Sequence, residues 1–471
     1  MSQSLSILVP LFNEEEFIAT LLDRVLHASL PDGMTREIVV VDDGSTDGSG
    51  DVVAEFSAAH PGIVKILRHN RNLGKGAAIR SALEQATGDF VIIQDADLEY
   101  DPGEYAHLLK PLLEGKADAV YGSRFMIAGE RRVLYYWHAL ANHALTGFLN
   151  LLADLNLTDM GTCYKAFRTS LLKSIPIRSD GFGFEAEITM KLARRRVSIY
   201  ETPISYHGRT YEEGKKIRPW DGIKTFGVIL HYWLVRDTYK ESGPEILDVL
   251  AGTPNFNRWM AETIRPFLGD TVLEIGAGIG NLTRHLARRR RRYIVSDIDQ
   301  EHLARLRNRL HHRPNLVAAR CDLTNAADFV PHSGQVDTVV CLNVLEHVSD
   351  DLGALRNLFT ALKTGGCAVV LVPQGQWAYG SLDRVLGHVR RYSKEELIGR
   401  MEQAGFKVER VIEFNHVTLP GWFLSGRIFR RRTFSRFQLA VFDHLVWLWR
   451  RIDRFLPWGP TSLIAIGRKP Q

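Results

Sequence analysis

The chain has 471 residues, of which 45% are hydrophobic and 24% are charged, proportions typical of a globular protein with room for two α/β domains. Its net charge of +5 is only mildly basic, and its basic and aromatic residues are not interleaved as in nucleic-acid-binding modules, so we expect no nucleic-acid partner. The four cysteines form no CxxC pair, which favours a reducing, cytoplasmic compartment over a disulfide-stabilised secreted protein.

Short apolar runs alternate with helical patterns in the first part of the chain. The predicted strands are residues 5–9, 37–41, 64–68 and 90–94, and the predicted helices are residues 15–28, 51–59 and 76–86. This alternation predicts βαβ units and a parallel sheet. Ligands of such sheets bind beyond the carboxyl ends of the strands, and the acidic turns of the sequence fall there.

Three acidic or glycine-rich segments follow predicted strands: residues 10–14 (PLFNE), 41–48 (VDDGSTDG) and 94–99 (QDADLE). In the third segment Asp95 and Asp97 are separated by one residue, so their carboxylates can converge on one divalent cation. Mg²⁺ and Mn²⁺ prefer such oxygen ligands and are commonly completed by phosphate oxygens. We therefore expect a Mg²⁺ or Mn²⁺ site that neutralises a departing nucleotide diphosphate.

Residues 133–153 contain no charged side chain, but polar residues such as His138 and Asn142 interrupt their apolar face. The segment is too polar to predict a membrane span, and both a buried core helix and an amphipathic helix at a membrane interface remain open. The second alternative allows a peripheral contact with the inner face of the membrane. Residues 422–458 mix Trp, Phe and Arg at helical spacing, and an interfacial contact is a further hypothesis there.

A second α/β series begins near residue 257. Its predicted strands are residues 271–275, 293–296, 336–342 and 368–372, and its predicted helices are residues 280–289 and 301–311. The residues between the two series are rich in Gly, Pro and charge, as linkers are. We therefore expect one domain over residues 1–240, a linker over residues 241–256 and a second domain over residues 257–471.

A series of motifs runs through the first domain: LFNEEEFI, VDDGSTDGS, NLGKGAAI, QDADLE (a DXD motif) and GSRF, followed by DMGTCYKAF, GFGFEAEI and HGRTYEEGKKI. In this order they resemble the family 2 glycosyltransferases of the GT-A fold, and among these the dolichyl- and polyprenyl-phosphate sugar synthases. The resemblance implies metal-dependent, inverting transfer of a sugar from a nucleotide-sugar donor of the UDP-glucose or GDP-mannose type. The acceptor would be a polyprenyl phosphate or a glycan.

This resemblance also implies roles for individual residues. The base and ribose of the donor would contact Pro10, Phe12, Glu14 and Asp42, and the metal and diphosphate would contact Asp95, Asp97 and Glu99. Arg124 would face the acceptor or the diphosphate, and a glycine-hinged loop would bring Arg209 and Lys216 over the diphosphate. Glu185 and Glu187 are candidate bases if the acceptor is a hydroxyl, since a phosphate acceptor needs no strong base. Lys75 is either a phosphate ligand at a helix start or an exposed cap residue.

The second domain has a glycine turn after its first strand, over residues 272–281 (VLEIGAGIGN). Glycines let the backbone approach a ligand closely, but this turn alone does not separate a nicotinamide cofactor from S-adenosylmethionine. Together with SDID, CDL and CLNVLEHV, the turn resembles the motifs of class I S-adenosylmethionine-dependent methyltransferases. The fold expected for the chain is therefore α/β, with two Rossmann-like domains.

Carried over position by position, this second resemblance implies an S-adenosylmethionine site. The methionine part would contact Glu274, Gly276, Gly278 and Asn281, the ribose Asp297, the adenine amine Asp322, and the strand edge of the site Asn343. His347 and His388 are candidate bases, and Arg390 and Arg391 are candidate ligands of an anionic acceptor.

These features predict a bifunctional enzyme that transfers a sugar and methylates a glycan or lipid-linked product. In one alternative, the methyltransferase-like domain is a binding or regulatory module without chemistry. In another, the glycine turn binds a nicotinamide cofactor of an oxidoreductase.

Overall fold

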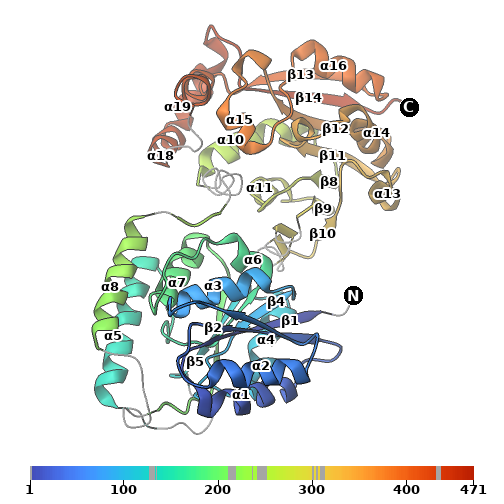
Figure 1. Cartoon of the computed structure of the whole chain (residues 1–471). Helices are drawn as coiled ribbons and strands as arrows, with labels where there is room; N and C mark the ends of the chain where they lie inside the picture. The colour runs from blue at the N-terminus through green and yellow to red at the C-terminus, as the bar shows by residue number, and fades with distance from the viewer. Residues whose placement is uncertain are drawn as a thin grey trace. The chain divides into compact units, whose positions relative to one another are not determined.

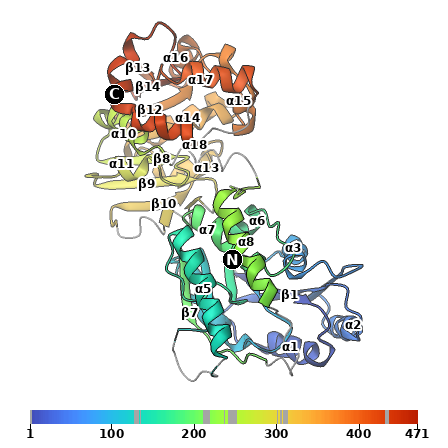
Figure 2. The same ribbon diagram turned by 90° about the vertical axis from the view of Figure 1, so that its left-hand side faces the viewer.

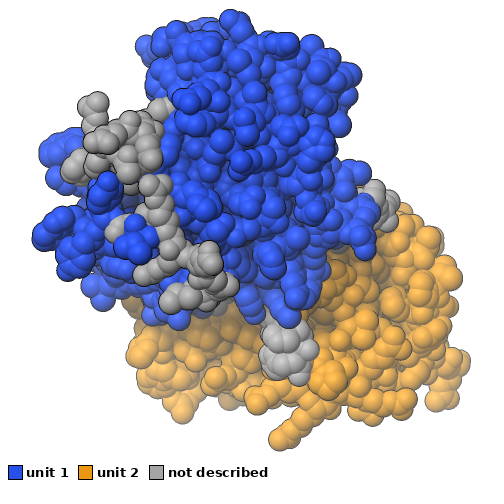
Figure 3. Space-filling model, turned by 90° about the horizontal axis from the view of Figure 1, so that it is seen from below, with its two compact units in different colours: residues 1–240 blue, residues 241–471 orange. Residues whose placement is uncertain are grey.

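The computed structural model describes residues 3–126, 133, 135–209, 219–235, 237–240, 252–299, 302–303, 306–307, 313–430 and 436–471. The chain forms two compact units, Met1–Lys240 (unit 1) and Glu241–Gln471 (unit 2), which Figure 3 colours separately. Each unit has a seven-stranded sheet with helices packed against it, as Figure 1 shows. Each unit therefore has its own sheet and its own hydrophobic core.

The sheet of unit 1 has the strand order β3-β2-β1-β4-β6-β5-β7. Its strands are β1 (Ser4–Leu11), β2 (Thr35–Asp42), β3 (Val64–Arg68), β4 (Phe90–Ile93), β5 (Ala119–Ser123), β6 (Lys165–Arg168) and β7 (Ile199–Pro203). Strands β1 to β4 pair in parallel and β5 pairs in parallel with β7, whereas β6 runs antiparallel to both of its neighbours. The loops that follow β1, β2 and β4 therefore emerge at one edge of the sheet.

Apolar patterning explains these elements. Strand β1 (SLSILVPL) is a nearly continuous apolar run, which suits a central parallel strand buried on both faces. Helix α1 (Glu15–His27) instead repeats apolar residues at helical spacing, and its buried residues are Ile18, Leu21, Leu22 and Val25. Its first turn is acidic and its last turn is basic, as the helix dipole favours.

The other helices of unit 1 are α2 (Ser49–Ala59), α3 (Lys75–Gln85), α4 (Tyr105–Leu113), α5 (Tyr136–Ala153), α6 (Thr169–Ser174), α7 (Phe184–Arg194) and α8 (Pro219–Leu234). Helices α5 and α8 lie side by side in both Figure 1 and Figure 2. Phe148 of α5 stacks on Phe226 of α8 with ring centroids 3.8 Å apart. Among the described residues, no helix combines the length and apolarity that crossing a membrane requires.

The sheet of unit 2 has the strand order β10-β9-β8-β11-β12-β14-β13. Its strands are β8 (Thr271–Ile275), β9 (Arg292–Asp297), β10 (Leu316–Arg320), β11 (Val336–Leu342), β12 (Leu362–Pro373), β13 (Lys407–Phe414) and β14 (Ser462–Arg468). Strands β8 to β12 pair in parallel, and β14 runs antiparallel between β12 and β13. The turns after β8, β9, β10 and β11 therefore share one edge of the sheet.

The longer helices of unit 2 are α10 (Pro254–Ile264), α14 (Asp351–Ala361), α16 (Lys394–Gln403) and α18 (Arg436–His444), and the shorter ones are α11 (Thr283–Leu286), α13 (Ala326–Phe329), α15 (Ser381–Leu386), α17 (Leu419–Phe423) and α19 (Val446–Ile452). One core cluster contains Leu355 of α14 and Leu397 of α16. The other contains Trp259 of α10 and Val446 of α19. Part of the aromatic, basic segment 422–458 thus packs into the core, while residues 431–435 lie outside the described residues.

The sheets and helices differ from the sequence predictions in three places. The strands predicted in the first part of the chain are β1 to β4 and they do pair in parallel, but each sheet also contains one antiparallel strand that was not predicted; β6 begins and ends with a charged residue and leaves no apolar run to recognise. The helix predicted at residues 280–289 is only α11, because Gly280 and Arg289 both adopt positive φ angles. Helix α10 begins within the predicted linker 241–256. Residues 241–251 and much of the predicted helix 301–311 lie outside the described residues.

Candidate functional site

A cavity of about 680 Å³ opens in unit 1 where the chain leaves β1 and β4. Its lining includes the sequence-predicted residues Pro10, Phe12, Glu14, Asp95, Asp97, Glu99, Arg124, Glu185 and Arg209. The sequence analysis did not single out Asp43 and Tyr206, which also line it. Lys216 lies outside the described residues.

The loops after β1 and β2 are joined by hydrogen bonds at one wall of this cavity. Asn13 has a positive φ of 49°, which turns the chain, and its side-chain oxygen accepts from the amide of Thr46 at 2.8 Å. The amide of Asn13 donates to Ser45 Oγ, and the amide of Glu14 donates to Ser49 Oγ. These bonds fix the position of Glu14 relative to the second acidic segment.

The two adjacent aspartates after β2 have different surroundings. Asp42 is buried, accepts the amide of Ser45 at 2.8 Å and lies 3.1 Å from Nε of Arg68. Asp43 lines the cavity and accepts the amides of Leu73 and Gly74 at 3.0 and 2.7 Å. Asp42 therefore lies behind the cavity wall, and its role toward the donor stays a prediction. The alternation of strands and helices in the sequence places both aspartates after a strand, but it cannot show which of the two faces a ligand.

Three carboxylates gather after β4, in the turn that contains Asp95, Asp97 and Glu99. Leu98 has a positive φ of 60°, and the amide of Glu99 donates back to Asp97 Oδ1 at 3.2 Å. Burial, together with the negative charges of Asp95 and Glu99, raises the pKa of Asp97 to about 7. Burial is the larger cause of this shift and repulsion among the carboxylates is the smaller, and a nearby cation would offset both.

Arg209 supplies positive charge to this cluster. Its Nη1 and Nη2 donate to the two carboxylate oxygens of Glu14 at 3.1 and 2.9 Å, and Nη2 also donates to Asp97 at 3.1 Å. The amide of Arg209 donates to Glu99 Oε1 at 2.7 Å, and Tyr206 donates its hydroxyl to Glu99 Oε2 at 2.7 Å. The predicted cation and the predicted acidic residues thus meet in one network.

Lys75 supplies a second positive charge. Its Nζ lies 2.8 Å from Asp95 Oδ1 and 3.1 Å from Glu185 Oε1, and only 14% of its side chain is exposed. Burial opposes its charge, but nearby groups, chiefly Asp95 and with it Glu185, raise the pKa of Lys75 well above its usual value. The alternative of an exposed cap lysine is therefore wrong. Glu185, the candidate base, is ion-paired in this structure.

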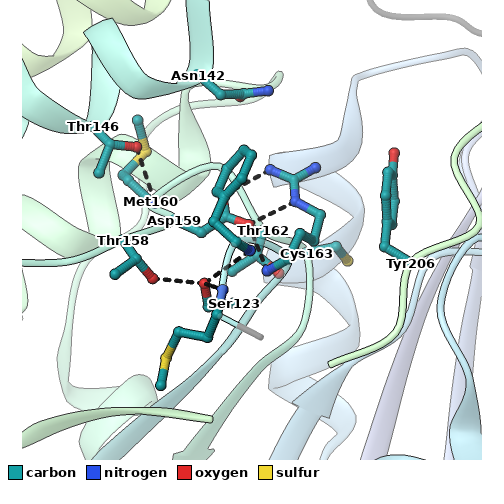
Figure 4. Close-up of polar contacts among 12 residues, drawn as sticks. Ser123, Asn142, Thr146, Thr158, Asp159, Met160, Thr162, Cys163 and Tyr206 are labelled. Carbon is teal, nitrogen blue, oxygen red and sulfur yellow. Dashed lines mark hydrogen bonds and ion pairs between the residues drawn. The ribbon is translucent and has the colours of Figure 1, made fainter. Parts of the chain in front are cut away.

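Arg124 follows β5 and is held by Asp159, which is fully buried. Its Nε and Nη2 donate to the two oxygens of Asp159 at 2.6 and 2.7 Å, and its guanidinium lies over the Tyr206 ring, 5.0 Å from the centroid. Figure 4 shows Asp159 beside Ser123 and Thr158, whose hydroxyls are 2.6 Å apart. Arg124 thus forms a rigid, cationic part of the cavity wall, and its contact with an acceptor stays a prediction.

The donor set of the cavity fits a Mg²⁺ or Mn²⁺ ion. Asp95, Asp97 and Glu99 offer carboxylate oxygens on one turn, and oxygen is the ligand that both ions prefer. Burial and the neighbouring carboxylates both raise the pKa of Asp97, and a bound cation would favour its ionised form. Metal, donor and acceptor roles of these residues remain predictions.

Unit 2 gathers its predicted cofactor residues at the carboxyl edge of β8, β9, β10 and β11. Gly276 and Gly278 have φ angles of 67° and 56°, so the turn after β8 uses conformations that favour glycine. A Cβ on Gly276 would lie 2.3 Å from Val344 Cγ2, whereas nothing described lies within 4 Å of one on Gly278. The turn therefore leaves backbone open at Gly278, beside Asn281.

Asp297, at the end of β9, faces this turn. Its Oδ2 accepts the amide of Gly278 at 2.7 Å, and its Oδ1 accepts the amide of Asp299 at 2.9 Å and lies 3.3 Å from His302 Nδ1. Burial opposes ionisation, but these hydrogen bonds, led by that from His302, lower the pKa of Asp297. The carboxylate is ionised and oriented, as a ligand of ribose hydroxyls requires.

The remaining predicted residues of this site differ in exposure. Asp322 accepts the amide and hydroxyl of Thr324 at 2.9 and 2.7 Å, and Asn343 is exposed with a positive φ of 55° after β11. Glu274 is buried, and its Oε2 accepts the hydroxyls of Thr283 and Tyr293 at 2.7 and 2.9 Å. Glu274 therefore stabilises this part of the fold through two buried hydrogen bonds.

The two arginines predicted to hold an anionic acceptor are already paired. Nη1 of Arg390 donates to Asp351 at 3.0 Å, and Nε of Arg391 donates to Asp383 at 2.8 Å. The Arg391 side chain is entirely buried, so the hypothesis of an anion site there is wrong for this residue. His347 and His388 lie next to each other, with ring centroids 4.9 Å apart.

Comparisons with known proteins identify both units. Residues 6–175 match the family model of glycosyl transferase family 2, and residues 273–368 match a methyltransferase domain model. Both family predictions are therefore confirmed, and the chain carries two transferase domains.

Each relative is similar to only part of this chain. An undecaprenyl-phosphate 4-deoxy-4-formamido-L-arabinose transferase of Edwardsiella ictaluri is 30% identical over 45% of this chain and 63% of its own length. A polyprenol monophosphomannose synthase of Mycolicibacterium smegmatis is 28% identical over 44% of this chain and 79% of its own. A solved glucosyl-3-phosphoglycerate synthase of Mycobacterium tuberculosis with uridine diphosphate is 22% identical, covering 50% of this chain and 82% of its own, with a TM-score of 0.39. The chain thus spans less than two thirds of the first relative.

The pKa of Glu274 generates a prediction about stability. Burial raises this pKa to about 7 in the folded protein, so the folded state holds the proton more tightly than the unfolded state does. The stability of the wild type should therefore fall as pH rises from about 4.5 through about 7. Glu274→Gln keeps an oxygen acceptor for both hydroxyls but cannot ionise. We expect the unfolding free energy of the variant, relative to wild type, to increase by about 2–3 kcal/mol between pH 5 and pH 8.

Urea unfolding at both pH values measures this difference. The control is Glu402→Gln, a change at an exposed carboxylate of the same unit, which should leave the pH dependence as in the wild type. An equal pH dependence in Glu274→Gln and wild type would contradict the prediction.

Proposed function

We propose that this enzyme, with a family 2 glycosyl transferase domain in unit 1 and a methyltransferase domain in unit 2, transfers a sugar from a nucleotide-sugar donor to a polyprenyl phosphate. The donor is of the UDP-glucose or GDP-mannose type, and unit 2 methylates a glycan or lipid-linked product with S-adenosylmethionine. The observation that carries the first activity is the cavity in which the carboxylates after β4 meet Arg209 and Lys75. Relatives named for undecaprenyl phosphate and polyprenol support the acceptor class.

Helices α5 and α8 support a lipid acceptor. Both line the cavity, through Asn142 and Leu145 of α5 and Thr225 of α8. Elsewhere the two helices expose large apolar side chains, including Trp137 (74% exposed) and Trp220 (63% exposed). Such a surface suits the interface of a membrane and the isoprenoid part of an acceptor, while the cavity suits its phosphate. A peripheral contact with the inner face of the membrane belongs to this proposal.

The residues of the cavity suggest how the first reaction runs. Glu14 and Arg209 would orient the donor, and Asp95, Asp97 and Glu99 would hold the ion. A bound Mg²⁺ or Mn²⁺ would neutralise charge that develops on the leaving diphosphate. A lipid phosphate is already ionised at neutral pH, so its oxygen can displace the diphosphate at the anomeric carbon without a strong base. Glu185 would accept a proton only from a hydroxyl acceptor.

In unit 2, alignment of the two substrates accounts for much of the expected catalysis. The open backbone at Gly278 and the ionised Asp297 would hold the nucleoside and methionine parts of S-adenosylmethionine. Methyl transfer then needs an acceptor atom placed in line with the sulfonium.

The metal role of Asp97 can be tested directly. Asp97→Ala should lower metal-dependent formation of glycosyl lipid by about 100-fold, because the diphosphate loses charge stabilisation in the transition state. The assay combines polyprenyl phosphate, Mg²⁺ or Mn²⁺ and a panel of labelled sugar nucleotides. The control is Asp23→Ala on α1, at a side chain that is 65% exposed. Donor hydrolysis without lipid product would indicate a glycan acceptor. If the protein bound no sugar nucleotide, the glycosyltransferase function of unit 1 would be contradicted.

The apolar face of α5 and α8 gives a second prediction. The double variant Trp137→Ser, Trp220→Ser should bind liposomes more weakly and show a several-fold higher KM for polyprenyl phosphate, because it buries less apolar area at the interface. Donor binding, measured by calorimetry, should not change. Tyr200→Ser on the strand β7, at a residue 43% exposed, is the matched control. Liposome binding equal to that of the wild type would remove the membrane contact.

The cofactor of unit 2 gives a third prediction. Asp297→Ala should weaken S-adenosylmethionine binding by about 10–100-fold, because the ribose hydroxyls would lose the charged carboxylate to which they donate hydrogen bonds. Isothermal titration with the full chain measures this loss, and Asp299→Ala is the matched control in the same loop. Wild-type protein without detectable affinity for S-adenosylmethionine would favour a non-catalytic module, and binding of a nicotinamide dinucleotide in its place would favour an oxidoreductase.

A further inference from the structure

Three side chains that can bind a metal meet just beyond β11 in unit 2. Glu346 and His347 belong to a short 3-10 helix (Leu345–His347), and His388 lies two residues after α15. One ligand atom from each of the three lies within 4.8 Å of the others. Asn343, which is predicted to line the cofactor site, directly follows β11 and lies three residues before Glu346. The cluster is therefore next to the expected methyl-transfer site.

Ordinary packing does not account for Glu346. Its side chain is fully buried, yet neither carboxylate oxygen has a hydrogen-bond partner in another described residue. Its Oε1 lies 3.8 Å from Nε2 of His388, which is too long for a hydrogen bond. A buried carboxylate without a partner is costly, and such groups normally contact a donor, a water or a metal ion. The space between Glu346 and His388 is therefore suited to a cation.

The opposite nitrogen of each histidine already has a partner. His388 Nδ1 lies 2.9 Å from Asp383 Oδ1, and Asp383 is itself held by Arg391. His347 Nδ1 lies 3.2 Å from the carbonyl oxygen of Gly387. Histidines that ligate metals usually donate their other N–H to a carboxylate or a carbonyl, which orients the ring and fixes its tautomer. Both rings therefore keep the Nε2 lone pair for a ligand.

We propose that Glu346, His347 and His388 bind one divalent transition-metal ion, with Zn²⁺ as the first candidate, and that an oxygen of the methyl acceptor takes an open coordination position. Two imidazoles and one carboxylate form a known type of Zn²⁺ site that leaves a position for water or substrate. Glu346 and His388 are buried and His347 is exposed, so a ligand can approach from the side of His347. The acceptor part rests on the proposed methyltransferase function, whereas binding of the ion does not.

Cobalt is a suitable probe because Co²⁺ bound to imidazole at low coordination number absorbs visible light far more strongly than six-coordinate Co²⁺ in an all-oxygen site. The carboxylates of unit 1 would form a site of the second kind, so they contribute little to the signal. The full chain is titrated with Co²⁺. We expect an absorption band that saturates near one equivalent and disappears when Zn²⁺, which binds such ligands more tightly, is added.

Glu346→Gln and His388→Gln should each weaken Co²⁺ binding at least about tenfold, as loss of metal-site residues does. His332→Gln, a change at a histidine of the same unit outside the cluster, should leave the titration unchanged. Glutamine has the shape of glutamate and needs no counter-ion, so Glu346→Gln should fold. Circular dichroism checks folding for each variant.

Two results would overturn the metal site: a wild-type chain that gives no band, or a Glu346→Gln variant that keeps wild-type Co²⁺ affinity. Titration with S-adenosylmethionine separates this outcome from failure of the proposed function. Cofactor binding without Co²⁺ binding removes only the metal site. Co²⁺ binding without cofactor binding keeps the metal site and removes the methyltransferase activity.

Discussion

The balance of charge at one edge of the unit 1 sheet is the interaction on which its site depends. Carboxylates from the loops after β1 and β4 lie close enough to repel one another, and Arg209 and Lys75 hold them together. Removing one partner of such a buried pair leaves the other uncompensated, which is strongly unfavourable. The guanidinium fork of Arg209 fits a diphosphate as well as it fits Glu14. A donor that brings both a cation and a diphosphate could therefore replace each ion pair with an equivalent one.

The candidate site of unit 2 lies at the corresponding edge of a similar sheet, but its side chains differ from those of the unit 1 site. Its first acidic residue, Glu274, is stabilised by two hydroxyl donors, and the glycine turn beside it offers backbone amides and little charge. Asp297 is an ionised group at this edge, and it accepts a hydrogen bond from the turn it faces. Such an arrangement would suit a neutral ribose and a cationic sulfonium, since neither needs cations such as Arg209 and Lys75 of the unit 1 cavity.

The sequence predicted best those features that follow from local pattern. Apolar runs located the central strands, and the acidic and glycine turns after them contain the residues of both candidate sites, because parallel strands end at a common edge. Strand β6, with Lys165 and Arg168 at its ends, gave no such run, and its place in the sheet depends on contacts distant in sequence. In the sequence Glu346 is an ordinary charged residue, so only the fold reveals that its carboxylate is buried without a hydrogen-bond partner among the described residues and lies beside His388.

The location of each set of functional residues bears on how the two activities are linked. All residues that line the unit 1 cavity belong to unit 1, and all predicted cofactor residues of the methyltransferase belong to unit 2. Within the described part of the chain, the residues of each candidate site therefore come from one unit. Under the proposed function, a shared acceptor and its product would link the two reactions. In that proposal the exposed tryptophans on α5 and α8 would hold the acceptor at a membrane surface, where a product released by one unit would stay at high local concentration for the other.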